Sequence, residues 1–468
     1  MHEEYKRKEE KELIRRFEAF LKNKEVHYFD EDSYLQVVTY YQNQEKLGLA
    51  LKACELAQEQ YPFSMEIVME KADVLIRLDR AKDAVEALDS ALNFHPNDPE
   101  IMIQKGNIHA LLAEYELAVE CYQKSLDYVE DKDEIYYSIG LSYQGMSKYD
   151  MAADNYKLAI EHNMLNENAL YELAYCLDIT GELESSLSYY NKFIDQDPYS
   201  EYAWYNLGIV YNKLGQYEKA VDAYEYALAI DDDFSSAHFN IGNSYMNLKK
   251  FDQALKSYLK TLDLEGPSAE IYCHLGAAYE RMENFERSVK YYQKATKLDQ
   301  MYHEAWYGLG VCLVLQEKWY EAIHFFNKAL KIDVENAMYW KAVADTEFKV
   351  GNIVSALDAY AEASEMDSEN YETWLDWSNV YYEQGDFEKA QDVIEEGLVE
   401  CPDIAELYYR SVVYLIEGGK YKMAINRLET ALMLDFDGHL KLFEFFPKLQ
   451  TQKALFKIVE QYRKNNLQ

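Results

Sequence analysis

The chain is poor in cysteine, proline and basic residues, and it lacks long apolar runs. Its 468 residues include only 6 Cys and 7 Pro. The cysteines form no C-x-x-C pair and are irregularly spaced, which argues against a disulfide framework or a zinc site and predicts reduced packing residues. No stretch reaches the ~18 uninterrupted apolar residues of a membrane-spanning helix, and the first residues include no apolar signal-peptide core. We therefore expect a soluble cytoplasmic protein without direct membrane insertion.

The shortage of basic residues leaves a large negative charge. The sequence has 84 acidic and 47 basic side chains, for a formal net charge of -37. This charge repels nucleic-acid phosphates and attracts basic partners. The excess lies in residues 31–438, because residues 1–30 are neutral and residues 439–468 carry four net positive charges. A nucleic-acid ligand is therefore not expected.

Motifs for chemistry are also missing. The ten His residues form neither an H-x-x-x-H nor an H-E-x-x-H pattern, so no metal site or His-based catalytic site is predicted. Gly308-Leu309-Gly310 follows no predicted strand and lies inside a predicted helix, where it indicates packing rather than nucleotide binding. We expect no cofactor and no enzymatic activity.

What the sequence does contain is a repeat of 34 residues. Aligning the chain on itself at this offset superposes like residues twelve times from residue 31 to 438, without insertion or deletion. In the copy at 201–234, Trp204, Leu207, Gly208 and Tyr211 share one face of a predicted first helix, and Gly215 can end it. Ala220 begins the matching stripe of a second helix. Each copy is therefore predicted to be a helix pair.

Two positions of the repeat are small in nearly every copy, as close helix packing requires. The twentieth position is Ala or Ser in all twelve copies. The eighth is Gly, Ala or Ser in the ten internal copies and Val38 or Val412 in the terminal ones. Atypical terminal copies are expected where an array ends. Phe193 replaces a small residue at the twenty-seventh position, so local packing should differ there.

The pattern W-x-x-L-G-x-x-Y, followed by Ala and an aromatic residue, resembles the tetratricopeptide-repeat (TPR) family. The resemblance covers residues 31–438 and implies an all-α solenoid, a right-handed superhelix of about twelve antiparallel helix pairs. Residues 1–30 and 439–468 show apolar helical patterns and are expected to cap the array at its two ends. An alternative for the C-terminal segment is a docking or self-association patch at Phe443, Phe445 and Phe446.

The resemblance also implies where a partner would bind. In TPR proteins the first helices line a concave groove, and the second, fifth, ninth and twelfth positions of the repeat face the ligand. Aromatic residues recur at the fifth position and near it, where they could stack on an extended peptide or fill gaps between repeats. The candidate groove residues are Tyr137, Tyr171, Tyr175, Tyr202, Tyr205, Asn206, Phe239, Asn240, Asn243 and Tyr307.

Acidic side chains surround these aromatic residues in the predicted groove. They include Glu66 and Glu100 at the second position and Asp73 at the ninth, although the helix dipole also favours carboxylates in a first turn. The Lys, Arg and Asn clamp of some TPR co-chaperones is missing, because Asp345 stands where the clamp needs Asn. Asn206 and Asn240 occupy the sixth position, as in the asparagine ladder of O-linked N-acetylglucosamine transferase, but the ladder stops after two rungs.

The sequence therefore predicts a non-catalytic scaffold or adaptor. Its partner is expected to be another protein, basic or amphipathic, held in an acidic, Tyr-rich groove within a larger complex. The alternative is a structural subunit that self-assembles, or attaches to a membrane complex, through its aromatic C-terminal segment. The oligomeric state is left open.

Overall fold

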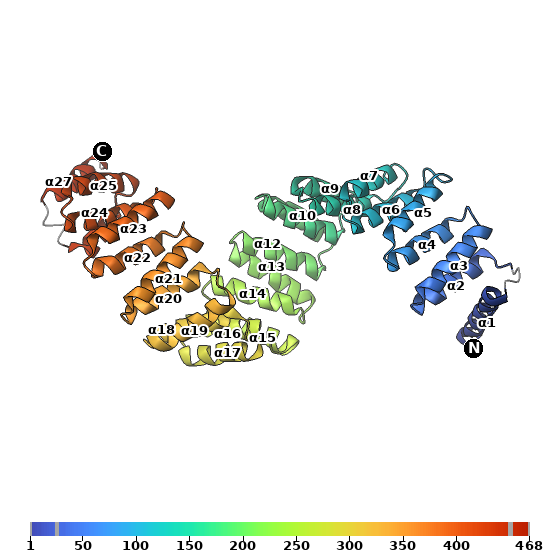
Figure 1. The fold of residues 1–468 in the computed structure, drawn as a ribbon, viewed down its shortest axis with the longest axis horizontal. Helices are drawn as coiled ribbons and strands as arrows, with labels where there is room; N and C mark the ends of the chain where they lie inside the picture. The colour runs from blue at the N-terminus through green and yellow to red at the C-terminus, as the bar shows by residue number, and fades with distance from the viewer. Residues whose placement is uncertain (1, 24–27, 448–452, 467–468) are drawn as a thin grey trace. The chain divides into compact units, whose positions relative to one another are not determined.

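The computed structural model describes residues 2–23, 28–447 and 453–466, which form α-helices and one short 3-10 helix. Figure 1 labels the helices in chain order. The described residues form no strand, which confirms the predicted all-α architecture. The chain divides into two compact units, an N-terminal unit (residues 1–237) and a C-terminal unit (residues 238–468).

The N-terminal unit consists of a leading helix and consecutive antiparallel pairs (Figure 1). Its helices are α1 (His2–Asn23), α2 (Glu31–Asn43), α3 (Leu47–Gln60), α4 (Met65–Arg77), α5 (Ala81–Leu92), α6 (Pro99–Leu111), α7 (Tyr115–Ser125), α8 (Asp133–Gly145), α9 (Tyr149–His162), α10 (Glu167–Ile179), η1 (Leu183–Ser185), α11 (Ser186–Gln196), α12 (Glu201–Lys213) and α13 (Tyr217–Ile230). The boundary between the units falls within α14 (Ser235–Asn247).

The C-terminal unit continues the pairs and ends in two further helices. Its helices are α15 (Phe251–Glu265), α16 (Ala269–Arg281), α17 (Phe285–Leu298), α18 (His303–Val314), α19 (Trp319–Ile332), α20 (Ala337–Lys349), α21 (Ile353–Met366), α22 (Tyr371–Glu383), α23 (Phe387–Glu400), α24 (Ala405–Glu417), α25 (Tyr421–Leu434), α26 (His439–Phe445) and α27 (Lys453–Asn466).

Every turn between the two helices of a repeat contains one residue with a left-handed backbone. It is always the fifteenth residue of the repeat, and its φ lies between 55° and 86°. Five of these residues are Gly, as the sequence predicts for Gly215, but seven carry a side chain, among them Ala113 with φ 58°. The turn geometry is thus constant while its sequence varies.

Several first helices, among them α4 and α12, begin at a capping side chain, and some of these side chains also link adjacent repeats. The Ser64 hydroxyl accepts the Ile67 N–H at 3.2 Å, and the Ser200 hydroxyl accepts the Ala203 N–H at 3.0 Å. The same hydroxyls donate to the carboxylates of Glu31 and Glu167, which begin the first helix of the preceding repeat. Each of these serines therefore joins two neighbouring repeats.

The small eighth position has a specific partner in the structure. A Cβ added to Gly208 would lie 2.5 Å from the ring of Tyr224, the twenty-fourth residue of the same repeat. Gly140 faces Tyr156 in the same way, at 2.4 Å. The sequence predicts close helix approach at this position, and the structure identifies the buried ring that fills the space.

The repeat that contains Phe193 begins its second helix differently from the other repeats. Phe193 is buried on α11, which is preceded by the 3-10 turn η1. At the N-terminal end of the array, Phe17 of α1 is buried against the rings of Phe29, Tyr34 and Tyr41. The α1 helix therefore covers the core of the first repeat.

Candidate protein-binding site

Within each unit, several first helices of successive repeats contact one another. In the N-terminal unit α2 contacts α4, α4 contacts α6, α8 contacts α10, and α10 contacts α12. Since residues four apart lie on one helix face, the fifth, ninth and thirteenth positions share one face of each first helix, and α8, α10 and α12 bring three such faces into contact. The N-terminal candidates Tyr137, Tyr171, Tyr175 and Tyr205 belong to this face.

The α10 helix presents a stripe of exposed apolar side chains on this face. Tyr171, Tyr175 and Ile179 follow one another at intervals of four residues and are 51%, 43% and 46% exposed. Tyr202 at the start of α12 is 53% exposed, and Leu141 on α8 is also exposed. We call these five residues the aromatic face. Exposed apolar side chains that recur along one helix in this way are typical of interaction surfaces.

The other fifth-position rings are half-buried and pack against their own repeats. Tyr137 lies 5.8 Å from Tyr156 between ring centroids, and Tyr205 lies 5.8 Å from Tyr224. In the C-terminal unit, Phe239 and Tyr307 lie 5.6 and 5.4 Å from the corresponding rings of Tyr258 and Phe326. These four rings therefore fill gaps within their own repeats, whereas the ring of Tyr171 is exposed.

Sequence reasoning missed the hydrogen-bond acceptors that the buried tyrosines require. The Tyr258 hydroxyl donates to Asn243 Oδ1 at 2.7 Å, so this candidate groove residue has a structural partner. Tyr292 donates to Glu280 at 2.9 Å, and Tyr360 donates to Asp345. Burial raises the pKa of each of these tyrosines well above the usual range. The detectable signal is a Tyr at the twenty-fourth position with a polar residue at the ninth or twelfth.

The sixth position connects first helices across repeats. Gln104 Nε2 donates to Asp73 Oδ1 at 2.7 Å, and Gln144 Nε2 donates to Glu172 Oε2 at 2.9 Å. At this position Asn206 is half-buried, and Asn240 accepts from Asn243 Nδ2 at 3.5 Å. The residues predicted as an asparagine ladder therefore occupy a position that often links one repeat to the next.

Lys341 forms ion pairs within its own chain, which agrees with the absence of the Lys, Arg and Asn clamp of TPR co-chaperones. Its ammonium lies 3.1 Å from Asp345 and 2.6 Å from Asp376. These carboxylates raise the pKa of Lys341, although burial acts in the opposite direction. The lysine is therefore already neutralised by two carboxylates of its own chain.

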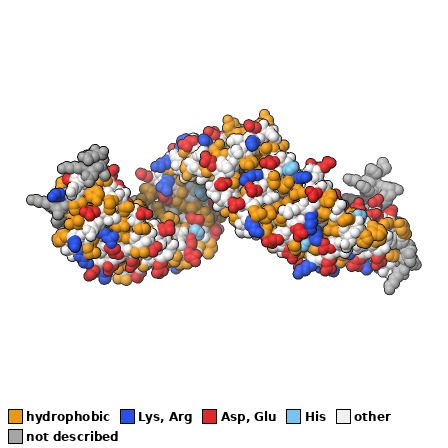
Figure 2. Space-filling view, turned by 90° about the horizontal axis from the view of Figure 1, so that it is seen from above, with side chains coloured by type: hydrophobic (Ala, Val, Ile, Leu, Met, Phe, Trp, Pro, Cys, Tyr) orange, Lys and Arg blue, Asp and Glu red, His pale blue; other side chains and the backbone are white. Residues whose placement is uncertain are grey.

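The acidic side chains of the first helices converge in the first three repeats. Glu66, Asp73 and Glu100 line one open groove together with Glu31 and Glu70. Acidic residues are also spread among hydrophobic ones on the face shown in Figure 2. Acidic and aromatic side chains were expected in a single groove, but the structure places this acidic cluster on α2, α4 and α6 and the aromatic face on α8, α10 and α12.

The three phenylalanines of the C-terminal segment pack against the last repeats. Phe446 is 5% exposed and belongs to a core with Leu442. The ring of Phe445 lies 3.6 Å from the Arg410 guanidinium carbon, and Phe443 packs on Phe456 with ring centroids 6.4 Å apart. These contacts resemble a cap more than an open docking patch.

Five of the six cysteines are buried. All six cysteines are free, and no group of three or more His, Cys, Asp or Glu side chains there is arranged to hold a metal ion. Burial raises the pKa of Cys54, Cys273 and Cys312 to about 12, so these thiols are poor nucleophiles. None of the described helices combines the length and apolar character needed to cross a membrane.

Helix pairs of 34 residues, with a small eighth residue facing a large twenty-fourth, define a TPR protein. Tetratricopeptide-repeat models match residues 35–100, 99–129 and 133–162. The model described as the cilia and flagella-associated protein 70 C-terminal domain matches residues 162–398, about half of the chain. The chain belongs to this family, and TPR families are generally protein-interaction modules that are typically non-catalytic.

The chain is similar to several solved structures. The APC/C hetero-tetramer Cut9-Hcn1 shares 15% identity, with 83% of this chain and 97% of that chain covered and a TM-score of 0.41. YrrB, described as a TPR protein with an unusual peptide-binding site, shares 21% identity over 39% and 93% of the two chains, with a TM-score of 0.31. MamA shares 23% over 35% and 95%, with a TM-score of 0.32. A sequence search of curated proteins finds no match.

Proposed function

We propose that this chain is a non-catalytic scaffold of cilia and flagella that binds a basic or amphipathic segment of a partner protein. The observation that carries the proposal is the aromatic face, where Tyr171 and Tyr175 expose their rings along α10 and Tyr202 exposes its ring in the first turn of α12. Rigid aromatic side chains provide large contact area at low entropic cost. The net charge of -37 favours basic partners, and the family description supports the ciliary setting.

The aromatic face can be tested by site-specific cross-linking in an extract of ciliated cells. A photoreactive phenylalanine analogue at Tyr175 should capture a partner protein, and higher salt should reduce this capture because the partner is basic. The matched control is the same analogue at Tyr226, an exposed tyrosine of the second helix α13. Equal capture at both positions would count against binding on the first helices.

A triple variant, Tyr171→Ala with Tyr175→Ala and Tyr202→Ala, tests the energetic contribution of these rings to binding. We expect the captured partner to bind about tenfold or more weakly, since aromatic anchors dominate interfaces. Because the three rings are exposed, helix content and the unfolding midpoint should change little. Unchanged affinity would contradict the proposal.

Self-assembly through the C-terminal segment has less support, because Phe446 is buried and Phe443 and Phe445 are half-buried against neighbouring rings and Arg410. The predicted cytoplasmic location and the domain boundaries at residues 30 and 438 stay predictions.

A further inference from the structure

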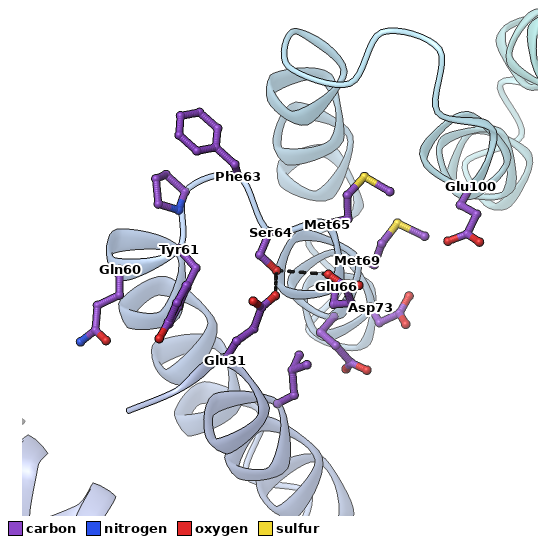
Figure 3. Close-up of a pocket in the computed structure, with 13 residues that line it drawn as sticks. Glu31, Gln60, Tyr61, Phe63, Ser64, Met65, Glu66, Met69, Asp73 and Glu100 are labelled. Atoms are coloured by element: carbon purple, nitrogen blue, oxygen red, sulfur yellow. Dashed lines mark hydrogen bonds between the residues drawn. The ribbon is translucent and has the colours of Figure 1, made fainter. Parts of the chain in front are cut away.

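An open groove of about 860 Å³ lies in the first three repeats, away from the aromatic face. Figure 3 shows it around the start of α4, with Met65 and Met69 on the side toward Glu100 of α6 and with Glu31 of α2 approaching Ser64. Leu35 and Phe63 add further apolar surface to its lining. The lining therefore combines apolar side chains, which we call the floor, with polar side chains, which we call the margin.

The margin carries five carboxylates without a cation. Glu31 accepts from the Ser64 hydroxyl, Glu70 accepts from Gln42 Nε2 at 3.1 Å, and Asp73 accepts from Gln104 Nε2 at 2.7 Å. All these donors are neutral. Among the described residues, no Lys, Arg or His forms an ion pair with any of the carboxylates that line the groove. The negative charge at this site is therefore left for another molecule to neutralise.

The floor is suited to binding apolar side chains of different shapes. Met65 and Met69 are half-buried, and the flexible thioether of methionine adapts to different partners. Phe63 is exposed, in edge contact with Phe94 at 5.1 Å between ring centroids. Phe63 therefore adds an exposed aromatic ring to the lining of the groove.

We infer that this groove is a second docking site, for a protein segment in which Arg or Lys adjoins a bulky apolar side chain. The apolar side chain lies on the two methionines, and the basic group reaches Glu70 and Asp73. Charge complementarity selects this occupant, since a neutral or acidic segment would leave the carboxylates uncompensated. The inference rests on the proposed function, because both require a protein partner, but it concerns different helices.

The test follows the methionine methyl signals of the full chain by nuclear magnetic resonance. The probe is a short synthetic amphipathic peptide of Leu, Ala and Arg, and its neutral analogue has citrulline in place of Arg. Met65→Leu and Met69→Leu assign the two signals, and Met338 of α20, in the C-terminal unit, serves as the reference. We expect the Arg peptide to shift the Met65 and Met69 signals and leave Met338 unchanged, and the citrulline analogue to shift none of them.

Two matched double variants separate local charge from the overall charge of the chain. Glu70→Gln with Asp73→Asn removes two charges in the groove and keeps acceptors for Gln42 and Gln104. Glu86→Gln with Glu116→Gln removes two exposed charges on α5 and α7. We expect about tenfold weaker peptide binding in the first variant and about twofold or less in the second, because close charge pairs contribute more than distant ones.

The outcomes distinguish this inference from the proposed function. Equal loss of binding in both double variants, or no shift of Met65 and Met69 at low salt, overturns the second docking site. Peptide binding that disappears in the Tyr171, Tyr175 and Tyr202 triple variant but persists in the Glu70 and Asp73 variant also overturns it, while leaving the aromatic face supported. Cross-linking at Tyr175 that fails while the methionine signals shift contradicts the proposed binding face alone.

Discussion

Glycine at the eighth position of a repeat is required by space rather than by backbone conformation. In the first helices of six repeats, an added Cβ would lie within 2.9 Å of the ring at the twenty-fourth position. Such distances force the ring or the helix to move. Ala72 and Ala174 occupy the eighth position in other repeats and are buried there.

The substitution Gly208→Ala should therefore destabilise the protein by about 1 to 3 kcal/mol, the usual effect of overpacking a core. The measurement is the midpoint of urea unfolding, followed by circular dichroism. Gly48→Ala is the matched control, since a Cβ at Gly48 meets no atom within 4 Å and alanine favours the helix. A loss of stability at Gly48 as large as at Gly208 would refute the packing explanation.

The small residues could be predicted from the sequence because they recur at the same two positions of nearly every repeat. The acceptors of the buried tyrosines could not be predicted individually. The Tyr156 hydroxyl donates to Gln144 at the twelfth position, whereas that of Tyr122 donates to Asn107 at the ninth. Either position lies within reach of the ring, so the side chains of each repeat decide between them.

At the scale of helices and turns, the fifteenth residue of each repeat has a left-handed backbone whether or not it is glycine. A residue with a Cβ has a cost of about 1 to 2 kcal/mol in this conformation. Seven repeats nevertheless carry such a residue, and the surrounding helix pair holds it in place.

Ala113→Gly should therefore stabilise the turn between α6 and α7 by up to about 1 kcal/mol, with the greater freedom of glycine in the unfolded chain reducing the gain. Gly215→Ala should have the opposite effect, since Gly215 has φ 70°. Ala110→Gly, in the last turn of α6, is the control and should lower stability by up to about 1 kcal/mol. Urea midpoints check all three, and stabilisation by Gly at both 110 and 113 would be inconsistent with this account.

The helix pairs were predictable because the apolar residues and the small residues recur at matching positions in the successive copies of the repeat. The binding surface was only partly predictable. Tyr171 and Tyr205 occupy the same position of consecutive repeats, yet Tyr171 is exposed, whereas Tyr205 packs 4.8 Å from Phe234 in addition to Tyr224. The difference arises from the residue that follows in the next loop, which a repeat alignment does not place in space.

At the scale of the whole molecule, many weak acids are buried in neutral form. Burial raises the pKa of Cys54, Cys273 and Cys312 from 9.0 to about 12, and that of Tyr122 from 10.0 to about 12. Several other buried tyrosines are raised further. The folded chain therefore binds more protons than the unfolded chain at alkaline pH.

Stability should accordingly be unaffected by these groups below about pH 9 and should fall as the pH rises from about 9 toward 12. Helix content by circular dichroism and tyrosinate absorbance should be recorded together during titration. We expect part of the tyrosine absorbance change to appear only as helix content is lost. Complete tyrosine ionisation with the helices intact would show that the buried hydroxyls are accessible.

The constant position of the left-handed turns has a consequence for how such a chain can evolve. When 34 consecutive residues are removed or duplicated, starting at any residue of the repeat, a small eighth residue still faces the side chain at the twenty-fourth position of its repeat. The left-handed turn still lies between the two helices of a pair. Inserting one residue within a helix instead rotates every later side chain of that helix by about 100° away from its partner. The gene can therefore change in length by whole repeats far more readily than by single codons, and each new repeat would arrive with its own candidate binding positions.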